Sequence, residues 1–69
     1  MFYPGIAFIT IPLLAMNLAI EIEQEEDGRF LAEVIGFLGV IAYGQTREEA
    51  VARVQALALR VLADKPKHG

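Results

Sequence analysis

The stretch LAIEIEQEEDGRFLAEV, residues 18–34, decides the fold. Residues 18–24 alternate apolar side chains with acidic or small ones, the period of two that gives a strand one inward and one solvent-facing side. Asp27 and Gly28 supply the turn chemistry of a tight hairpin, which needs positive backbone φ. Residues 30–34 alternate again with their apolar side chains on the same face. The stretch therefore predicts an antiparallel hairpin.

A third strand and a helix are predicted after this hairpin. Residues 35–39 break the alternation with two glycines and predict a loop. Residues 40–43 return to an apolar composition that is typical of a strand. Thr46 is followed three residues later by Glu49, a spacing that predicts a helix N-terminus with a capping box.

The predicted helix carries one apolar stripe. Its residues recur at spacings of three and four and are Ala50, Val51, Val54, Leu57, Ala58, Val61 and Leu62. Pro66 cannot continue a helix, so the helix is expected to end near Ala63 or Asp64. Because the stripe needs an apolar surface to cover it, it should lie across the sheet. The sequence thus predicts an α+β fold in the order β-β-β-α, a three-stranded antiparallel sheet with one helix packed on one face.

The first twenty residues carry no charged side chain. About 20 apolar residues suffice to span a bilayer, but Pro4, Gly5 and Pro12 interrupt this run and no Lys or Arg flanks it. Residues 6–11 are rich in β-branched and aromatic side chains, which favours an extra strand or an apolar arm over a membrane segment. A further alternative is that the frame begins at Met16.

Composition excludes several classes of function. The chain has 69 residues, and a core this small rarely contributes more than about 3–5 kcal/mol of net stability, so we expect a homodimer or a higher homo-oligomer. The absence of Cys excludes disulfides and thiolate chemistry, and the single histidine, His68, excludes a His-based triad. The net charge of -3 opposes phosphate backbones, so direct nucleic-acid binding is not expected.

The acidic hairpin carries the candidate site. Four carboxylates are predicted to share one face of its strands: Glu21, Glu23, Glu25 and Glu33. Such a group can hold Mg²⁺ or act as an acid–base pair, or it can form a solvated face or meet a basic, RNA-binding protein. No nucleophile accompanies it, so we assign no catalytic residue, metal or cofactor and treat it as a partner-binding face. Tyr43 is expected to pack on the helix edge.

Two segments carry a likeness to a known family. They are EDGRFLAEV, residues 26–34, and AYGQTREEA, residues 42–50. With their surroundings they resemble the HicB-like antitoxin family over residues 18–62, which is 62 − 18 + 1 = 45 of the 69 residues. The resemblance implies a degenerate ribonuclease H-like core without catalytic carboxylates. It also implies a partner, because in that family this domain binds and blocks a small mRNA-cleaving toxin of the HicA type.

The chain departs from the family pattern in its loop and at both ends. The family loop commonly reads Pro-x-Leu-Pro-Gly-Cys, whereas Ile35, Leu38 and Val40 stand at the positions of the prolines and the cysteine. We expect the chain to lack the family's DNA-binding C-terminal domain, and its first fifteen residues have no family counterpart. The resulting division is an apolar arm or extra strand at 1–16, a HicB-like domain at 17–64 and a tail at 65–69.

These features predict a cytoplasmic, non-enzymatic protein-interaction module that neutralises a small basic RNA-cleaving toxin. Two alternatives from other classes stay open. One is a ribonuclease H-like, metal-dependent hydrolase that uses the acidic hairpin face, and bound Mg²⁺ near Glu21 and Glu23 would distinguish it. The other is a small membrane-attached protein that uses residues 1–20, and partition into membranes would distinguish it.

Overall fold

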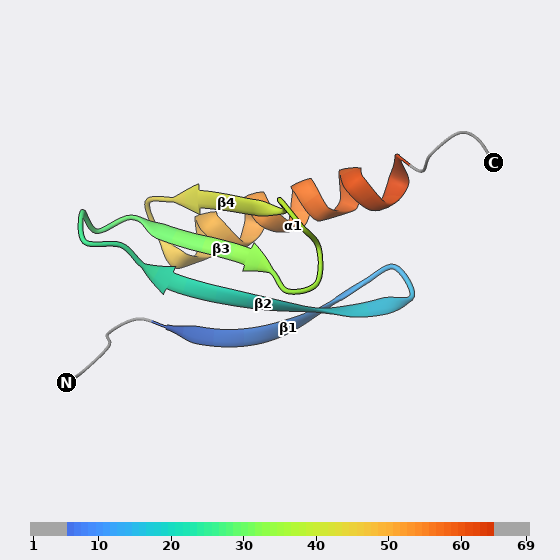
Figure 1. Cartoon of the computed structure of the whole chain (residues 1–69), viewed down its shortest axis with the longest axis horizontal. Coiled ribbons are helices and arrows are strands. Elements are labelled where there is room, and N and C mark those ends of the chain that lie inside the picture. Colours follow the sequence, from blue (N-terminus) through green and yellow to red (C-terminus); the bar gives the residue numbers. More distant parts are fainter. Residues whose placement is uncertain (1–5, 65–69) are drawn as a thin grey trace.

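Four strands and one helix follow one another along residues 6–64, which the computed structural model describes (Figure 1). They are β1 (Ala7–Leu13), β2 (Met16–Gln24), β3 (Phe30–Val34), β4 (Ile41–Gly44) and α1 (Arg47–Ala63). The strands form one antiparallel sheet in the order β1-β2-β3-β4. The predicted α+β class is confirmed, and the sheet includes the extra N-terminal strand. The predicted tail at 65–69, with His68, lies outside the described residues.

The core lies between one face of the sheet and α1. Buried side chains alternate with more exposed ones along β2 and β3, because successive side chains of a strand point to opposite faces. The buried hydrophobic residues are Leu13, Leu18, Ile20, Ile22, Ala32, Val34, Val40, Ala50, Val54 and Ala58. The predicted helix stripe supplies three of these, but its Val61 is 44% exposed. The hairpin strands thus turn their predicted apolar side toward the core.

The loop between β2 and β3 spans Glu25 to Arg29 and is closed by two backbone hydrogen bonds. The Glu25 N–H donates to the Arg29 carbonyl at 2.7 Å, and the Gly28 N–H donates to the Glu25 carbonyl at 3.0 Å. Gly28 has a φ of 93° and Asp27 has no positive φ, so only the glycine takes the left-handed conformation. Asp27 instead accepts a hydrogen bond from the Arg29 N–H at 3.0 Å.

Strand β1 runs through Pro12, where the sequence predicted that it would end. Pro12 lies opposite Asn17, and Leu13 lies opposite Met16, so the loop between β1 and β2 has two residues. Leu14 in this loop has a φ of 58°. β1 is an edge strand, and an edge strand tolerates proline where its missing N–H would face away from the neighbour.

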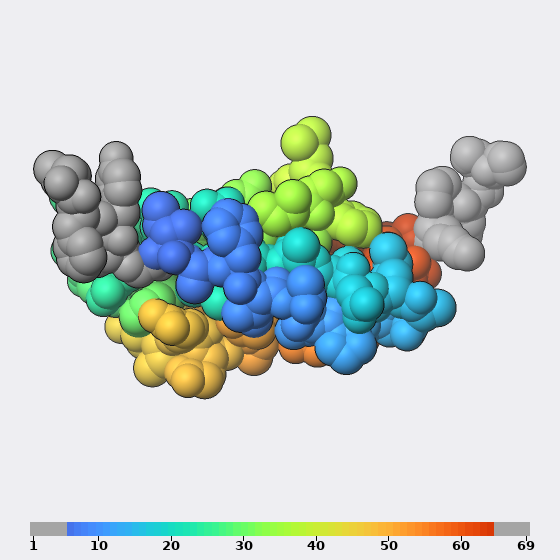
Figure 2. All heavy atoms as spheres, turned by 90° about the horizontal axis from the view of Figure 1, so that it is seen from below, coloured from blue at the N-terminus to red at the C-terminus, as the bar shows by residue number. Residues whose placement is uncertain are grey.

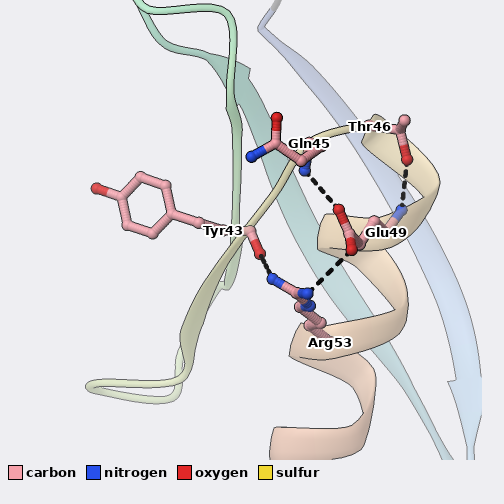
Figure 3. Close-up of polar contacts among 5 residues, drawn as sticks. All are labelled: Tyr43, Gln45, Thr46, Glu49 and Arg53. Atoms are coloured by element: carbon pink, nitrogen blue, oxygen red, sulfur yellow. Dashed lines mark hydrogen bonds and ion pairs between the residues drawn. The ribbon is translucent and has the colours of Figure 1, made fainter.

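The start of α1 is capped much as the sequence predicts. The Thr46 Oγ1 accepts a hydrogen bond from the Glu49 N–H at 3.0 Å, which satisfies a donor of the first turn (Figure 3). The Glu49 carboxylate accepts from the Gln45 N–H at 2.6 Å, one residue earlier than a standard capping box would place it. Its other oxygen pairs with Arg53 at 2.9 Å, and Arg53 donates to the Tyr43 carbonyl at 3.1 Å. These bonds join the first helical turns to the end of β4.

Helix α1 packs on β4 and β3 and touches the margin of β2. The approach is closest at Gly44, where an added Cβ would overlap the backbone N of Ala50 and come within 2.9 Å of the Ala50 Cα and the Glu49 carbonyl carbon. Gly44 is therefore required by the close helix and not by a turn. Within residues 6–64, no helix is long and apolar enough to cross a membrane.

We predict that Gly44→Ala destabilises the fold. The new methyl group meets helix backbone, which cannot move aside as a side chain can, and overpacking of this kind costs about 1–3 kcal/mol. Thermal melts of the variant should show a clearly lower Tm. Gln45→Ala is the matched control, because its side chain is exposed and the Tm should hardly change. If Gly44→Ala and the parent chain had the same Tm, the close contact between Gly44 and the backbone of α1 would be contradicted.

Candidate partner-binding surface

The face of the sheet that points away from α1 combines acidic and apolar side chains. We call it the open face. Strand alternation and the register between strands place on it Phe8, Thr10, Ala19, Glu21, Glu23, Leu31, Glu33, Ile41 and Tyr43. Phe8 is 64% exposed, and Ile41 and Tyr43 are each 40% exposed. The open face is therefore a mixed surface and not a purely solvated one.

Glu21 and Glu33 are direct cross-strand partners. Partners across an antiparallel pair have Cβ atoms about 4.5–5.5 Å apart, and two like charges in that position destabilise the sheet. The ion pairs that lie within residues 6–64 are Arg29–Asp27 and Arg53–Glu49, so neither compensates the two open-face glutamates. A positively charged group placed beside both carboxylates would relieve this repulsion.

Two rows of side chains cross the open face. The first row runs Phe8, Glu21, Glu33, Ile41, so each end of the carboxylate pair has an exposed hydrophobic neighbour. The second row runs Glu23, Leu31, Tyr43. A charged centre with apolar flanks suits a protein partner, because apolar contacts around a charged pair exclude water from it.

Arg29 and Tyr43 form the end of the open face nearest the β2–β3 loop. The Arg29 guanidinium lies 4.5 Å from the centre of the Tyr43 ring, and its Nε donates to the Asp27 carboxylate at 2.9 Å. The Tyr43 ring points away from α1 (Figure 3), so the prediction that it packs on the helix edge is wrong. The reason is strand parity, since Val40 and Gly44 are the buried residues on either side.

Glu25 lies outside β2, in the loop after it. It lines an open hollow of ≈ 520 Å³ together with Glu23, Gln24, Glu26 and Asp27. The four predicted glutamates thus separate into the Glu21–Glu33 pair, Glu23 in the second row, and Glu25 at the loop. Over residues 6–64, no group of three or more His, Asp or Glu side chains could hold a metal ion.

Hydrogen bonds from Arg29 lower the pKa of Asp27 below its ordinary value. The backbone N–H of Arg29 is the largest cause, and its side chain adds a second bond. A lowered pKa means that the folded chain favours the ionised carboxylate. Ionised Asp27 therefore stabilises the folded chain slightly at any pH above the pKa that Asp27 has in the unfolded chain. This stabilisation is lost as the pH falls through the pKa of Asp27 in the folded chain.

Comparisons of the chain with protein-family models, with curated proteins and with solved structures returned no match. Sequence reasoning missed Phe8 and the Arg29–Tyr43 contact. Both depend on strand register, a long-range property for which the local sequence gives no signal.

We predict that the Asp27 pKa, measured by NMR titration of its carboxyl carbon, is below that of an unstructured Asp. In Arg29→Gln the pKa should rise only part of the way, because the main-chain N–H of residue 29 still donates. A full return of the Asp27 pKa to the ordinary value in Arg29→Gln would contradict the dominance of the backbone bond.

Proposed function

We propose that the chain is a non-enzymatic protein-interaction module of the HicB-like antitoxin kind, which binds a small basic RNA-cleaving toxin through the open face. The observation that carries the proposal is the uncompensated Glu21–Glu33 pair between the exposed hydrophobic residues Phe8 and Ile41. Two adjacent carboxylates that repel each other in the free chain gain most from a partner's Lys or Arg. The pair is thus suited to a basic protein.

The element order supports the same proposal. Strands β2, β3 and β4 followed by α1 give the β-β-β-α order that the resemblance to the HicB-like family implies. Of the two segments that carry the resemblance, one lies in the β2–β3 hairpin and one at the β4–α1 junction. β1 and the departures in residues 35–40 are the parts of the chain outside this likeness.

Inhibition would follow from competition with RNA. A ribonuclease of this kind uses a basic surface to hold its substrate's phosphates. An acidic face that covers this surface removes the counter-charge for RNA and blocks access to it. Phe8, Ile41 and Tyr43 would add apolar contact around the charged centre, which slows dissociation. Because the substrate is mRNA, the proposed complex belongs in the cytoplasm.

We predict that charge reversal on the open face abolishes inhibition. The assay mixes the chain with a small basic HicA-type ribonuclease and follows cleavage of a labelled RNA. The parent chain should inhibit, and Glu21→Lys together with Glu33→Lys should weaken inhibition at least about thirtyfold, since truncating one partner of a paired interface charge costs about 2–5 kcal/mol. Inhibition should also fall as salt rises.

Glu48→Lys together with Asp64→Lys is the matched control, because it makes the same change of charge at two exposed positions at the ends of α1, away from the open face. This control should leave inhibition unchanged once a thermal melt shows that it is folded. If it weakened inhibition as much as reversal of Glu21 and Glu33, net charge alone would explain the effect. Lack of inhibition by the parent chain would contradict the proposed partner.

We also predict that the purified chain neither cleaves RNA nor binds DNA. The net charge of -3 opposes phosphates, and the described carboxylates do not gather as a metal site. The measurement is RNA cleavage and DNA gel retardation with and without added Mg²⁺. Mg²⁺-dependent cleavage that is lost in Glu21→Gln would instead support the ribonuclease H-like hydrolase.

A further inference from the structure

The outer edge of β1 is open and uncharged. β1 is the first strand in the sheet order, and no segment within residues 6–64 pairs with its outer side. Figure 2 looks onto this edge, where the atoms of β1, in blue, run along the near side of the molecule. The strand reads AFITIPL and carries no charge, although charged side chains are the usual means of keeping a sheet edge from pairing.

The register shows which backbone groups face outward. A two-residue loop makes Leu13 and Met16 a hydrogen-bonded pair, and such pairs alternate along an antiparallel ladder. Ile11 and Ile9 therefore bond to β2, whereas Phe8, Thr10 and Pro12 turn their backbone groups outward. Pro12 fits this assignment, since its missing N–H lies where β2 needs no donor.

We propose that a second copy of the chain pairs with this edge, antiparallel and in full overlap, with the two-fold axis at Thr10. Thr10 then exchanges hydrogen bonds with Thr10 of the second copy, and the Phe8 N–H donates to the Pro12 carbonyl of that copy. The pairing continues the sheet through both chains. It rests on β1 alone and does not depend on the proposed function.

The side chains of β1 fit this register on both faces. On the helix side, Ile9 meets Ile11 of the second copy; Ile9 is 37% exposed in the single chain. On the open face, Phe8, which is 64% exposed, meets Pro12 of the second copy. Self-pairing thus adds contacts to the two exposed large hydrophobic residues of β1, Phe8 and Ile9.

The charges permit the same arrangement. Glu21 of each copy lies opposite Phe8, one strand behind β1, so the two are about 14 Å apart across the sheet and about 13 Å apart along it, or about 19 Å in all. That distance exceeds the Debye length of about 8 Å at physiological salt, so their repulsion is screened. A strand from another protein would need an uncharged edge that matches β1, whereas β1 of a second copy provides such an edge by symmetry.

The size of the contact sets its strength. A seven-residue strand is about 23 Å long and a sheet about 10 Å thick, which gives roughly 230 Å² of contact cross-section. Standard interfaces bury about 800 Å² per partner. The dimer should therefore be weak and should dissociate on dilution. Because Glu21 and Glu33 remain on the open face, each dimer would present two acidic surfaces on one side of a continuous sheet.

The direct test uses single cysteines, which is clean because the chain has no Cys of its own. Thr10→Cys places the two sulfurs across the axis, where the Cα atoms of a hydrogen-bonded pair lie about 5.5 Å apart, within disulfide range. Thr10→Cys should form a covalent dimer under a mild redox buffer. The control is Leu38→Cys, at a loop residue 98% exposed and away from β1, which should stay monomeric.

A second measurement requires no cross-link. Sedimentation of the parent chain over a range of concentration should show a monomer–dimer equilibrium. Thr10→Lys, at an exposed position, sets two ammonium groups across the axis and should raise the midpoint concentration about fivefold or more, the equivalent of about 1 kcal/mol. Ala56→Lys, at an exposed helix position, should leave the midpoint unchanged. A parent chain that stays monomeric at millimolar concentration, or equal cross-linking of Thr10→Cys and Leu38→Cys, would overturn the proposal.

Discussion

The contact between Gly44 and Ala50 determines what the rest of the molecule can cover. The absence of a side chain at Gly44 and the small ones at Ala50 and Ala58 let α1 lie close against β4. A helix is about 10 Å across and strands are about 4.8 Å apart, so one helix covers roughly two strands. Seated on β4 and β3, α1 leaves Ile9 of β1 partly exposed on the helix side and leaves the whole opposite face open (Figure 1).

The uncovered surfaces differ in chemistry, which is why we assign them different roles. The open face has the Glu21–Glu33 pair at its centre, and charge of one sign selects for a partner of the other sign. The β1 edge has backbone donors and acceptors and no charge, which suits another strand. A small domain with one helix gains stability from either contact, because both bury apolar area that its own core does not reach.

The elements that the sequence predicts well are those with a strong local signal. Alternation fixed the inward side of residues 18–24 and 30–34, and Thr46 with Glu49 located the start of α1. The turn at Leu14 carries no glycine or asparagine, so nothing local marked its positive φ. Tyr43 was misplaced because β4 is short and wholly uncharged, which gives no alternation from which to read its facing. Phe8 lies beside Glu21 on the open face because of the β1–β2 register, which is a long-range property that no local pattern encodes.

Residue-resolved amide hydrogen exchange on the dilute chain tests the central claim, that β1 belongs to the sheet and keeps a free outer edge. The account predicts protected amides at Ile9 and Ile11, which donate to β2, and fast exchange at Phe8 and Thr10, which face outward. Protection of this alternating kind would establish both the pairing and the free edge. Equally fast exchange at all four amides would contradict it, since β1 would then not be part of the sheet.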